Sequence, residues 1–379
     1  MILSLALSMW AVPPTPPPVI EASSTIDVVI FSKAPPRRLH FHSGGCALPG
    51  LGRINTAEVS KQGVRFCRGS GATKKCQDSP SASVTCDGLA KLSAPGVPAR
   101  LYGRRFRVGR QGAGLRVVSA IDLEAYVRGV AEAELSFAPP AAKWAQMLVA
   151  RTFALKAMAG PRHDDGAVCD LTHCQAFAGV PKPEPLPSAR LDVLVDRQGQ
   201  LADVFFHSTC GGRTIIPSRL WPALPSRDLI PVEDVDAKGQ AYCRSSPHFR
   251  WVFEVDEQRL AAALEGAAGR PLDPSTLALV AVDPDFAHWK VSDRDGWVHV
   301  GGEVMHLELS RVFGFGAVKS SRFAALRAGT NFRLSGYGLG HRVGLCQMGA
   351  VARATAGQNG MEIIHAYFPA LDLAKVVLK

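Results

Sequence analysis

The chain has 379 residues and a formal net charge of +10, and 47% of its residues are hydrophobic while 20% are charged. This composition is typical of a globular protein with one large or two ordinary domains. The positive charge favours an anionic partner, such as nucleic acid, anionic lipid or the bacterial cell wall. Because the sequence has no run of five like charges and no aromatic-plus-basic ribonucleoprotein motif, we expect no nucleic-acid partner.

The first 25 residues are predicted to be an export segment followed by a linker. Met1–Val12 is apolar and too short to span a bilayer, so it resembles the core of an export signal, although it lacks a basic residue. A buried N-terminal strand is the alternative. Pro13–Pro18 predicts a stiff, extended linker. No other stretch is long and apolar enough for a membrane helix, so we expect an exported protein that is not an integral membrane protein.

Residues 26–100 are predicted to form a small cysteine-rich N-terminal lobe. Ile26–Phe31 and Arg38–His42 are strand candidates, whereas Ser43–Pro95 is rich in Gly, Ser and Lys. A segment with so few large apolar residues needs covalent support, and two disulfides would supply it. A zinc site on four cysteines is the competing hypothesis, but CxxC pairs are absent from this segment. The cysteines concerned are Cys46, Cys67, Cys76 and Cys86.

Two strands and a pair of helices follow. Residues 101–121 predict strands joined by a turn at 111–114. Ser119 and Asp122 form a capping-box-like start, so we expect the first helix to begin near Ala120. Pro139 and Pro140 suit the first turn of the second helix, which we expect to end at Gly160-Pro161.

The first helix carries an acid where its apolar face predicts a hydrophobic residue. Leu123, Val127 and Val130 recur at spacings of four and three, and the next position on that face is Glu134. Glu132 lies towards solvent instead. Burial against apolar neighbours would raise the pKa of Glu134 and keep it protonated enough to act as a general acid. An acid at a frayed helix end is the structural alternative.

A cluster of histidine and cysteine follows the second helix. Thiolates and imidazoles so close in sequence suit a tetrahedral zinc ion, and a disulfide between Cys169 and Cys174 is the alternative. The residues of this cluster are His163, Cys169, His173 and Cys174.

The second half of the chain offers two glycine-rich loops. A hairpin over residues 191–206 would deliver the first, His207–Gly212, whose paired glycines allow close backbone approach to a ligand or form a plain turn. Residues 258–268 predict a short helix, residues 278–300 predict strands, and residues 301–334 contain further strand candidates. The second loop, residues 336–347, opens a helix and carries His341, which is either a core residue or a cleft-lining one. Its glycine spacing matches no nucleotide-binding motif.

Four segments of this chain resemble the SpoIID/LytB family of peptidoglycan-acting proteins. The match covers roughly residue 101 to the C-terminus in the order of the family's motifs. Two departures are Leu135-Ser136 in place of Met-Pro, and Arg342 in place of the second glycine of GHG. The segments are YVRGVAEAEL, WAQMLVARTFAL, FHSTCGGRT and GYGLGHRVGLCQMGA.

The resemblance implies an α+β fold, with a SpoIID-like domain over residues 101–379 that has mixed strands and a central helix pair. It implies a lytic transglycosylase of the bacterial cell envelope that cleaves the bond between N-acetylmuramic acid and N-acetylglucosamine in peptidoglycan, leaving a 1,6-anhydro end. Glu134 falls on the family's catalytic acid. Some members carry zinc at the histidine-cysteine cluster, so we expect a structural zinc there and no organic cofactor. The residues expected to orient the glycan are Gln146, Arg151, Ser208, Gly211, Gly212, His341 and Gln347.

There are three alternative functions. Some relatives are described as amidase enhancers, so a module that binds peptidoglycan and stimulates a cell-wall amidase is the main alternative. A thiol hydrolase that uses Cys346 and His341 needs these two side chains in contact. A serine esterase is disfavoured because the sequence has no GxSxG motif.

Overall fold

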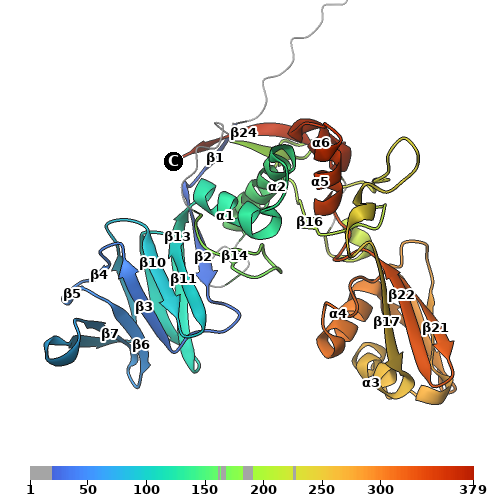
Figure 1. Cartoon of the computed structure of the whole chain (residues 1–379), viewed down its shortest axis with the longest axis horizontal. Helices are drawn as coiled ribbons and strands as arrows, with labels where there is room; N and C mark the ends of the chain where they lie inside the picture. The colour runs from blue at the N-terminus through green and yellow to red at the C-terminus, as the bar shows by residue number, and fades with distance from the viewer. Residues whose placement is uncertain (1–18, 161–162, 164–167, 182–190, 225–227) are drawn as a thin grey trace, which may run out of the picture.

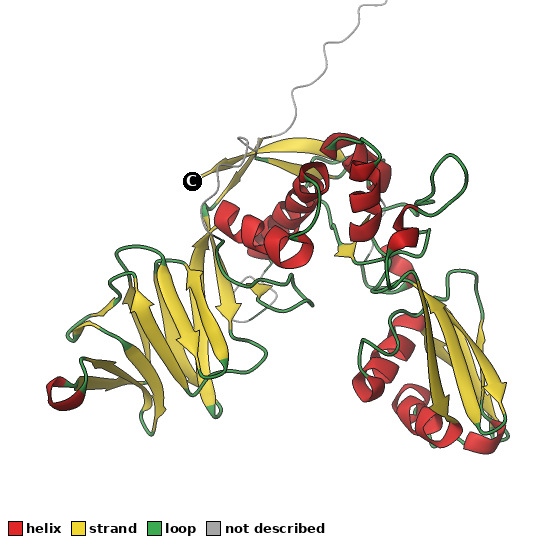
Figure 2. Ribbon diagram, in the orientation of Figure 1, coloured by secondary structure: helices red, strands yellow, loops and turns green. Residues whose placement is uncertain are grey.

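The computed structural model describes residues 19–160, 163, 168–181, 191–224 and 228–379. The predicted export segment and the Pro13–Pro18 linker lie outside the described residues, which begin at residue 19. The fold is α+β, as predicted: a helical middle part lies between an N-terminal pair of sheets and a second β-rich module (Figure 1). Figure 2 shows that the strands of the N-terminal part and the helices of the middle part form separate regions, whereas in the second β-rich module helices lie beside the sheet. Among the described residues, no helix is long and apolar enough to cross a membrane.

The N-terminal part is built from two sheets around one core. The six-stranded sheet has the order β11-β10-β3-β6-β7-β8 and the seven-stranded sheet the order β14-β2-β13-β12-β9-β4-β5. Leu39 and Phe66 of the first sheet pack in the same core as Val84 and Phe106 of the second. The strands are β2 (Thr25–Ile30), β3 (Arg38–Ser43), β4 (Ala47–Leu48), β5 (Gly52–Arg53), β6 (Thr56–Ser60), β7 (Gly63–Arg68), β8 (Lys75–Ser79), β9 (Ser81–Thr85), β10 (Ala90–Ala94), β11 (Val97–Tyr102), β12 (Arg105–Gln111), β13 (Gly114–Asp122) and β14 (Val168–Cys169).

The cysteine-rich lobe is held by two disulfides, which confirms the prediction. Cys46 pairs with Cys86, and Cys67 pairs with Cys76. The lobe also has a larger apolar core than its composition suggested, because it shares β12 and β13 with the rest of the chain. The expected boundary at residue 100 therefore falls inside this pair of sheets.

The helix pair consists of α1 (Leu123–Leu135) and α2 (Pro140–Ala159). The first helix begins three residues later than predicted, because Ser119–Asp122 is the end of strand β13, which pairs with β2. Asp122 is the N-cap, and its carboxylate accepts a hydrogen bond from the Ala125 N–H at 2.9 Å. Ser119 instead accepts a hydrogen bond from the Gly103 N–H.

A small sheet and two short helices complete the middle part. Its three strands have the order β1-β24-β15, so β15 pairs with the C-terminal strand. The hairpin predicted over residues 191–206 therefore does not form as a strand pair beyond one bridge, Val195 to Leu201. The elements are β1 (Val19–Ala22), β15 (Asp192–Val195), β24 (Asp372–Leu378), α5 (Gln347–Thr355) and α6 (Gly360–Tyr367).

Residues 250–337 form a module of their own between the two glycine-rich loops (Figure 1). Its core is centred on Trp289 and Phe323, whose rings stack with their centroids 4.4 Å apart. The sequence predicted strands over residues 301–334, but residues 302–313 are helix α4. The elements are β17 (Arg250–Asp256), α3 (Glu257–Ala268), β18 (Ala278–Ala281), β19 (His288–Asp293), β20 (Gly296–Gly301), α4 (Gly302–Phe313), β21 (Phe323–Ala328) and β22 (Asn331–Tyr337).

Candidate functional site

Glu134 lies in the last turn of α1, half-buried, where two hydrogen bonds hold its carboxyl group. Oε1 accepts from the Ala176 N–H at 3.0 Å, and Oε2 accepts from the Gln347 side-chain amide at 3.2 Å. Burial raises the pKa of Glu134 above its ordinary 4.5, against the opposing effect of these two hydrogen bonds. Glu132, by contrast, is exposed and forms an ion pair with Lys143. The helical spacing thus separates the two acids as predicted.

The two glycine-rich loops pack against each other and bring Gln347 to this position. Strand β16 (Phe206–His207) pairs in parallel with β23 (Leu345–Cys346), directly before Gln347. Gly344 has a φ of +73°, and a Cβ there would lie 2.2 Å from the Phe205 carbonyl oxygen. Glycine is needed at this point because only a residue without a side chain allows so close a backbone approach. The main role of the glycine spacing is therefore packing between the two loops.

A cavity of about 830 Å³ opens beside this arrangement. One wall is aromatic: the Trp221 ring lies 5.2 Å from the Phe205 ring and 5.2 Å from the His341 ring, centroid to centroid. Cys174 also lines the cavity, two residues before Ala176, which donates to Glu134. Glu134 is not itself a lining residue, and its hydrogen bond to Ala176 links it to the segment that forms part of the cavity wall.

His341 is a cavity-lining residue with a neutral ring. Its Nδ1 accepts a hydrogen bond from the Val343 N–H at 3.1 Å, which leaves the proton on Nε2. Burial and, to a smaller extent, the neighbouring His207 lower the pKa of His341 to about 3. The imidazole is therefore suited to donate a hydrogen bond to a ligand and unsuited to acid-base catalysis near neutral pH.

Two cavity residues were missed by sequence reasoning. Trp221 lies in a loop-rich region for which the sequence predicted no structure. Glu303 lies in the first turn of α4, half-buried, and burial raises the pKa of its carboxyl group. Glu303 is outside every motif and in a segment predicted as strand, so its only sequence signal was its charge.

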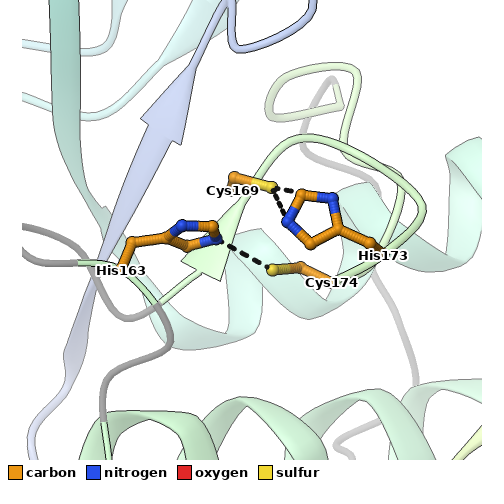
Figure 3. Close-up of side chains that lie close together, drawn as sticks. All are labelled: His163, Cys169, His173 and Cys174. Carbon is orange, nitrogen blue, oxygen red and sulfur yellow. Dashed lines mark hydrogen bonds between the residues drawn. The ribbon is translucent and has the colours of Figure 1, made fainter.

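The structure brings the four predicted metal ligands together (Figure 3). His163 Nε2 lies 3.3 Å from the Cys174 sulfur, and His173 Nε2 lies 3.4 Å from the Cys169 sulfur. All four donor atoms lie within 4.8 Å of one another, and both thiols are free rather than paired in a disulfide. A hydrogen bond from the Cys169 thiol lowers the pKa of Cys174 to about 5. Two sulfurs and two imidazole nitrogens fit the preferences of tetrahedral zinc.

Arg151 and Gln146, two residues of α2 predicted to orient the glycan, are both buried. The Arg151 guanidinium is buried and forms a two-pronged ion pair with Glu124, at 2.6 Å and 2.8 Å, and donates to the Asp192 carbonyl. The predicted pairing of Arg151 with a ligand carboxylate therefore finds no support here, because Glu124 already accepts two hydrogen bonds from the guanidinium. Gln146 is fully buried in α2, and its amide forms no hydrogen bond within the described part of the chain.

The loop of paired glycines is also an interior feature. Gly211 and Gly212 are buried, with φ of +73° and +97°. The Gly211 carbonyl accepts from Arg322, and the Gly212 carbonyl accepts from the Asp234 N–H. The prediction that these glycines contact a glycan is therefore not supported. Ser208 is half-buried, and its carbonyl accepts a hydrogen bond from the Met348 N–H at the start of α5.

Arg342 and Cys346 both lie in the interior. Arg342 keeps a left-handed φ of +63°, and its guanidinium donates to the Asp285 carbonyl of the 250–337 module. The cation thus joins two parts of the fold and leaves the cavity free. The Cys346 sulfur is fully buried, and its hydrogen-bond partners are backbone groups of the two loops. A buried thiol does not suit the thiol hydrolase alternative.

Comparison with known protein families finds a similarity that includes the helix pair. Residues 111–195 match the family model described as SpoIID, stage II sporulation protein. The matched range holds α1, α2, Glu134 and the whole histidine-cysteine cluster. A search of curated proteins finds no match to this chain.

Proposed function

We propose, from the match of residues 111–195 to the SpoIID family model, that the protein is a peptidoglycan-binding lytic transglycosylase with Glu134 as its acid and base. The observation that carries the proposal is the Glu134 carboxyl group, which is half-buried, has a raised pKa and is held by Ala176 and Gln347. A carboxyl group whose pKa is raised by burial and whose orientation is fixed suits general acid catalysis.

In the proposed reaction, Glu134 donates its proton to the oxygen between C1 of N-acetylmuramic acid and C4 of N-acetylglucosamine. The bond between C1 and the glycosidic oxygen breaks, and its electron pair remains on the glycosidic oxygen. The Glu134 carboxylate then accepts the proton of the C6 hydroxyl group while the C6 oxygen bonds to C1, which leaves a 1,6-anhydro end. Glu134 regains its proton, and no water is consumed. One carboxyl group serves both steps, in contrast to the two carboxylates of most glycosidases.

The cavity supports the binding of a glycan strand. Aromatic rings stack on the apolar faces of sugars, and Phe205 and Trp221 line one wall together with His341. We propose that the neutral ring of His341, which lines the cavity, contacts the sugar there. Glu303 adds a second half-buried carboxyl group from the 250–337 module, for which we propose a hydrogen-bonding role toward the ligand.

We assign a structural zinc to His163, Cys169, His173 and Cys174. The ion would tie the end of α2 to the segment that carries Ala176, and so support the hydrogen bond to Glu134. Stoichiometric zinc in purified protein, lost in Cys169→Ser, is the expected result. A Cys169–Cys174 disulfide in freshly isolated protein would contradict the assignment, because a cystine lacks the thiolates that zinc needs.

We further propose that the protein is exported to the bacterial cell envelope. The two disulfides of the N-terminal lobe support this, because such bonds persist in oxidising compartments. Peptidoglycan is the anionic polymer of that compartment that suits the net charge of +10.

The deciding experiment is mass spectrometry of peptidoglycan sacculi digested with the purified protein, with and without their stem peptides. Wild-type protein should release anhydro-muropeptides, and Glu134→Gln should reduce the rate by roughly two to four orders of magnitude, the usual effect of losing a general acid. Glu132→Gln is the matched control and should change little, because that carboxylate is exposed and paired with Lys143. If no anhydro products form while an added amidase is stimulated, the amidase-enhancer function replaces this one.

A further inference from the structure

A second group of metal-ligating side chains lies in the interior of the middle part, away from the histidine-cysteine cluster. Cys210, Asp234, Cys243 and Cys346 are all buried, and one donor atom from each lies within 4.8 Å of the others. The Cys210 sulfur is 3.6 Å from the Cys243 sulfur and 3.3 Å from Asp234 Oδ2. All three thiols are free. The four side chains come from four separate segments, so the fold itself assembles the group.

We propose that these four residues bind a second structural zinc ion, with three thiolates and one carboxylate as ligands. With Zn–S of about 2.3 Å and Zn–O of about 2.0 Å, a tetrahedral site needs sulfurs about 3.8 Å apart and a sulfur–oxygen separation of about 3.5 Å. The measured 3.6 Å and 3.3 Å lie within a few tenths of an ångström of these values. The group is thus nearly of the size that one zinc ion requires.

The surroundings of Asp234 leave one oxygen for the metal. Oδ1 accepts from the Tyr367 hydroxyl group at 2.9 Å and from Arg353 Nε at 3.1 Å, whereas Oδ2 faces the Cys210 sulfur. Hydrogen bonds to the outer oxygen are the usual way in which a protein orients a carboxylate ligand. Arg353 also balances part of the negative charge that three thiolates and a carboxylate bring to a zinc ion.

The sulfurs are surrounded by backbone donors. The Cys346 sulfur accepts from the Cys210 N–H at 3.2 Å and from the Gly349 N–H at 3.4 Å, and the Cys210 sulfur accepts from the Gly212 N–H at 3.3 Å. N–H groups directed at sulfur stabilise thiolates, and the hydrogen bond from Gly349 makes Cys346 the N-cap of α5. Gly349 must be glycine, because a Cβ there would lie 2.3 Å from Asp234 Oδ2.

A disulfide explains the group less well. Three thiols leave one without a partner after any pairing, and a cystine offers no reason for a fully buried carboxylate beside it. A zinc ion uses all four side chains. It would also fix Cys346, the residue directly before Gln347, and so hold the amide that donates to Glu134.

The test is the zinc content of the full-length protein, measured by elemental analysis and by native mass spectrometry. We expect two zinc ions per wild-type chain. The double variant Cys169→Ser/Cys174→Ser, which removes the other cluster, should retain one. Asp234→Asn and Cys243→Ser in the wild-type background should each lower the content by one. No zinc in wild-type protein, or a zinc content that is unchanged in both Asp234→Asn and Cys243→Ser, would overturn the proposal.

A second measurement on unmodified wild-type protein guards against variants that fail to fold. A thiol reagent that displaces zinc, used with a metal indicator, should release one ion with two thiols and the other with three, because the two sites differ in thiolate number. Cobalt bound to the double variant should show thiolate-to-cobalt charge-transfer absorption. A native disulfide between any two of Cys210, Cys243 and Cys346 would contradict the proposal. Because neither readout involves catalysis, this proposal and the proposed enzymatic function fail independently.

Discussion

Gln347 donates a hydrogen bond from its side-chain amide to Oε2 of Glu134 at 3.2 Å, across 213 positions of sequence. Glu134 lies in the last turn of α1, and Gln347 is the first residue of α5. The contact therefore depends on the packing of the two glycine-rich loops, which places α5 against the helix pair. It makes the protonation of Glu134 sensitive to a residue far away in the chain.

The first prediction concerns the pH dependence of cleavage. A general acid must be protonated, and burial raises the pKa of Glu134 above 4.5. Activity should therefore be full below the pKa of the folded protein and fall as the pH rises through it. The pH profile of kcat/KM on purified glycan strands tests this. A profile with a rising limb at the pKa of Glu134 would contradict the assigned role.

The second prediction concerns Gln347. Its hydrogen bond stabilises the Glu134 carboxylate and so lowers the pKa of that group. In Gln347→Leu the pKa of Glu134 should rise, and the falling limb of the profile should move to higher pH. Gln347→Glu is a useful companion, because a second carboxyl group beside Glu134 should move the limb in the same direction. An unchanged limb in both variants would show that the contact does not influence catalysis.

Helical periodicity was sufficient to place Glu134 because the pattern depends only on the local chain. Leu123, Val127 and Val130 are buried, and the same face carries Glu134 into a partly buried position. The two lobe disulfides were likewise predictable from a shortage of apolar residues, although their pairing was not.

Arg151 and the paired glycines show where the sequence was insufficient. A buried arginine and a ligand-binding arginine have the same side chain, and only the fold reveals that Glu124 occupies its guanidinium. Gly211 and Gly212 have left-handed φ angles that suit either a ligand loop or tight packing. In each case the deciding partner lies far away in sequence.

Helix α4 was missed because its apolar residues do not follow one face. Met305 and Leu309 are buried, but Val304, Leu307 and Val312 are 46%, 41% and 54% exposed. Apolar residues on both sides hide the helical period, and the segment then resembles a strand. Glu303, which enters the cavity from the start of this helix, was lost with it.

The third prediction is that Arg151 contributes to stability and not to ligand binding. Its side chain is 3% exposed and that of its partner Glu124 is 24% exposed. Arg151→Met should lower the free energy of unfolding by about 3 kcal/mol, because it leaves a largely buried carboxylate without its partner. Chemical denaturation measures this. Glycan affinity of the folded variant should be unchanged, and the double variant Arg151→Met/Glu124→Leu should recover part of the loss.

The fourth prediction ranks the two lobe disulfides. The bond between Cys46 and Cys86 closes a sequence separation of 40, whereas that between Cys67 and Cys76 closes one of 9. Loop-closure entropy gives about 4 kcal/mol for the first and about 2.7 kcal/mol for the second. The Cys46→Ser/Cys86→Ser variant should therefore unfold at lower denaturant concentration than Cys67→Ser/Cys76→Ser. The reverse order would indicate that native contacts, rather than chain entropy, dominate.

The last prediction tests the aromatic wall of the cavity. Trp221 contacts the rings of Phe205 and His341, and its face is the largest aromatic surface available to a sugar there. Trp221→Ala should weaken binding of glycan strands by roughly 2- to 10-fold, the equivalent of about 0.5–1.5 kcal/mol of aromatic contact. Trp297→Ala is the matched control: Trp297 is 56% exposed, lies on β20 of the 250–337 module and does not line the cavity. Calorimetry with purified strands should separate the two variants. Equal affinities would indicate that the glycan binds elsewhere. The Glu134 predictions would be unaffected, because cleavage and its pH profile test them.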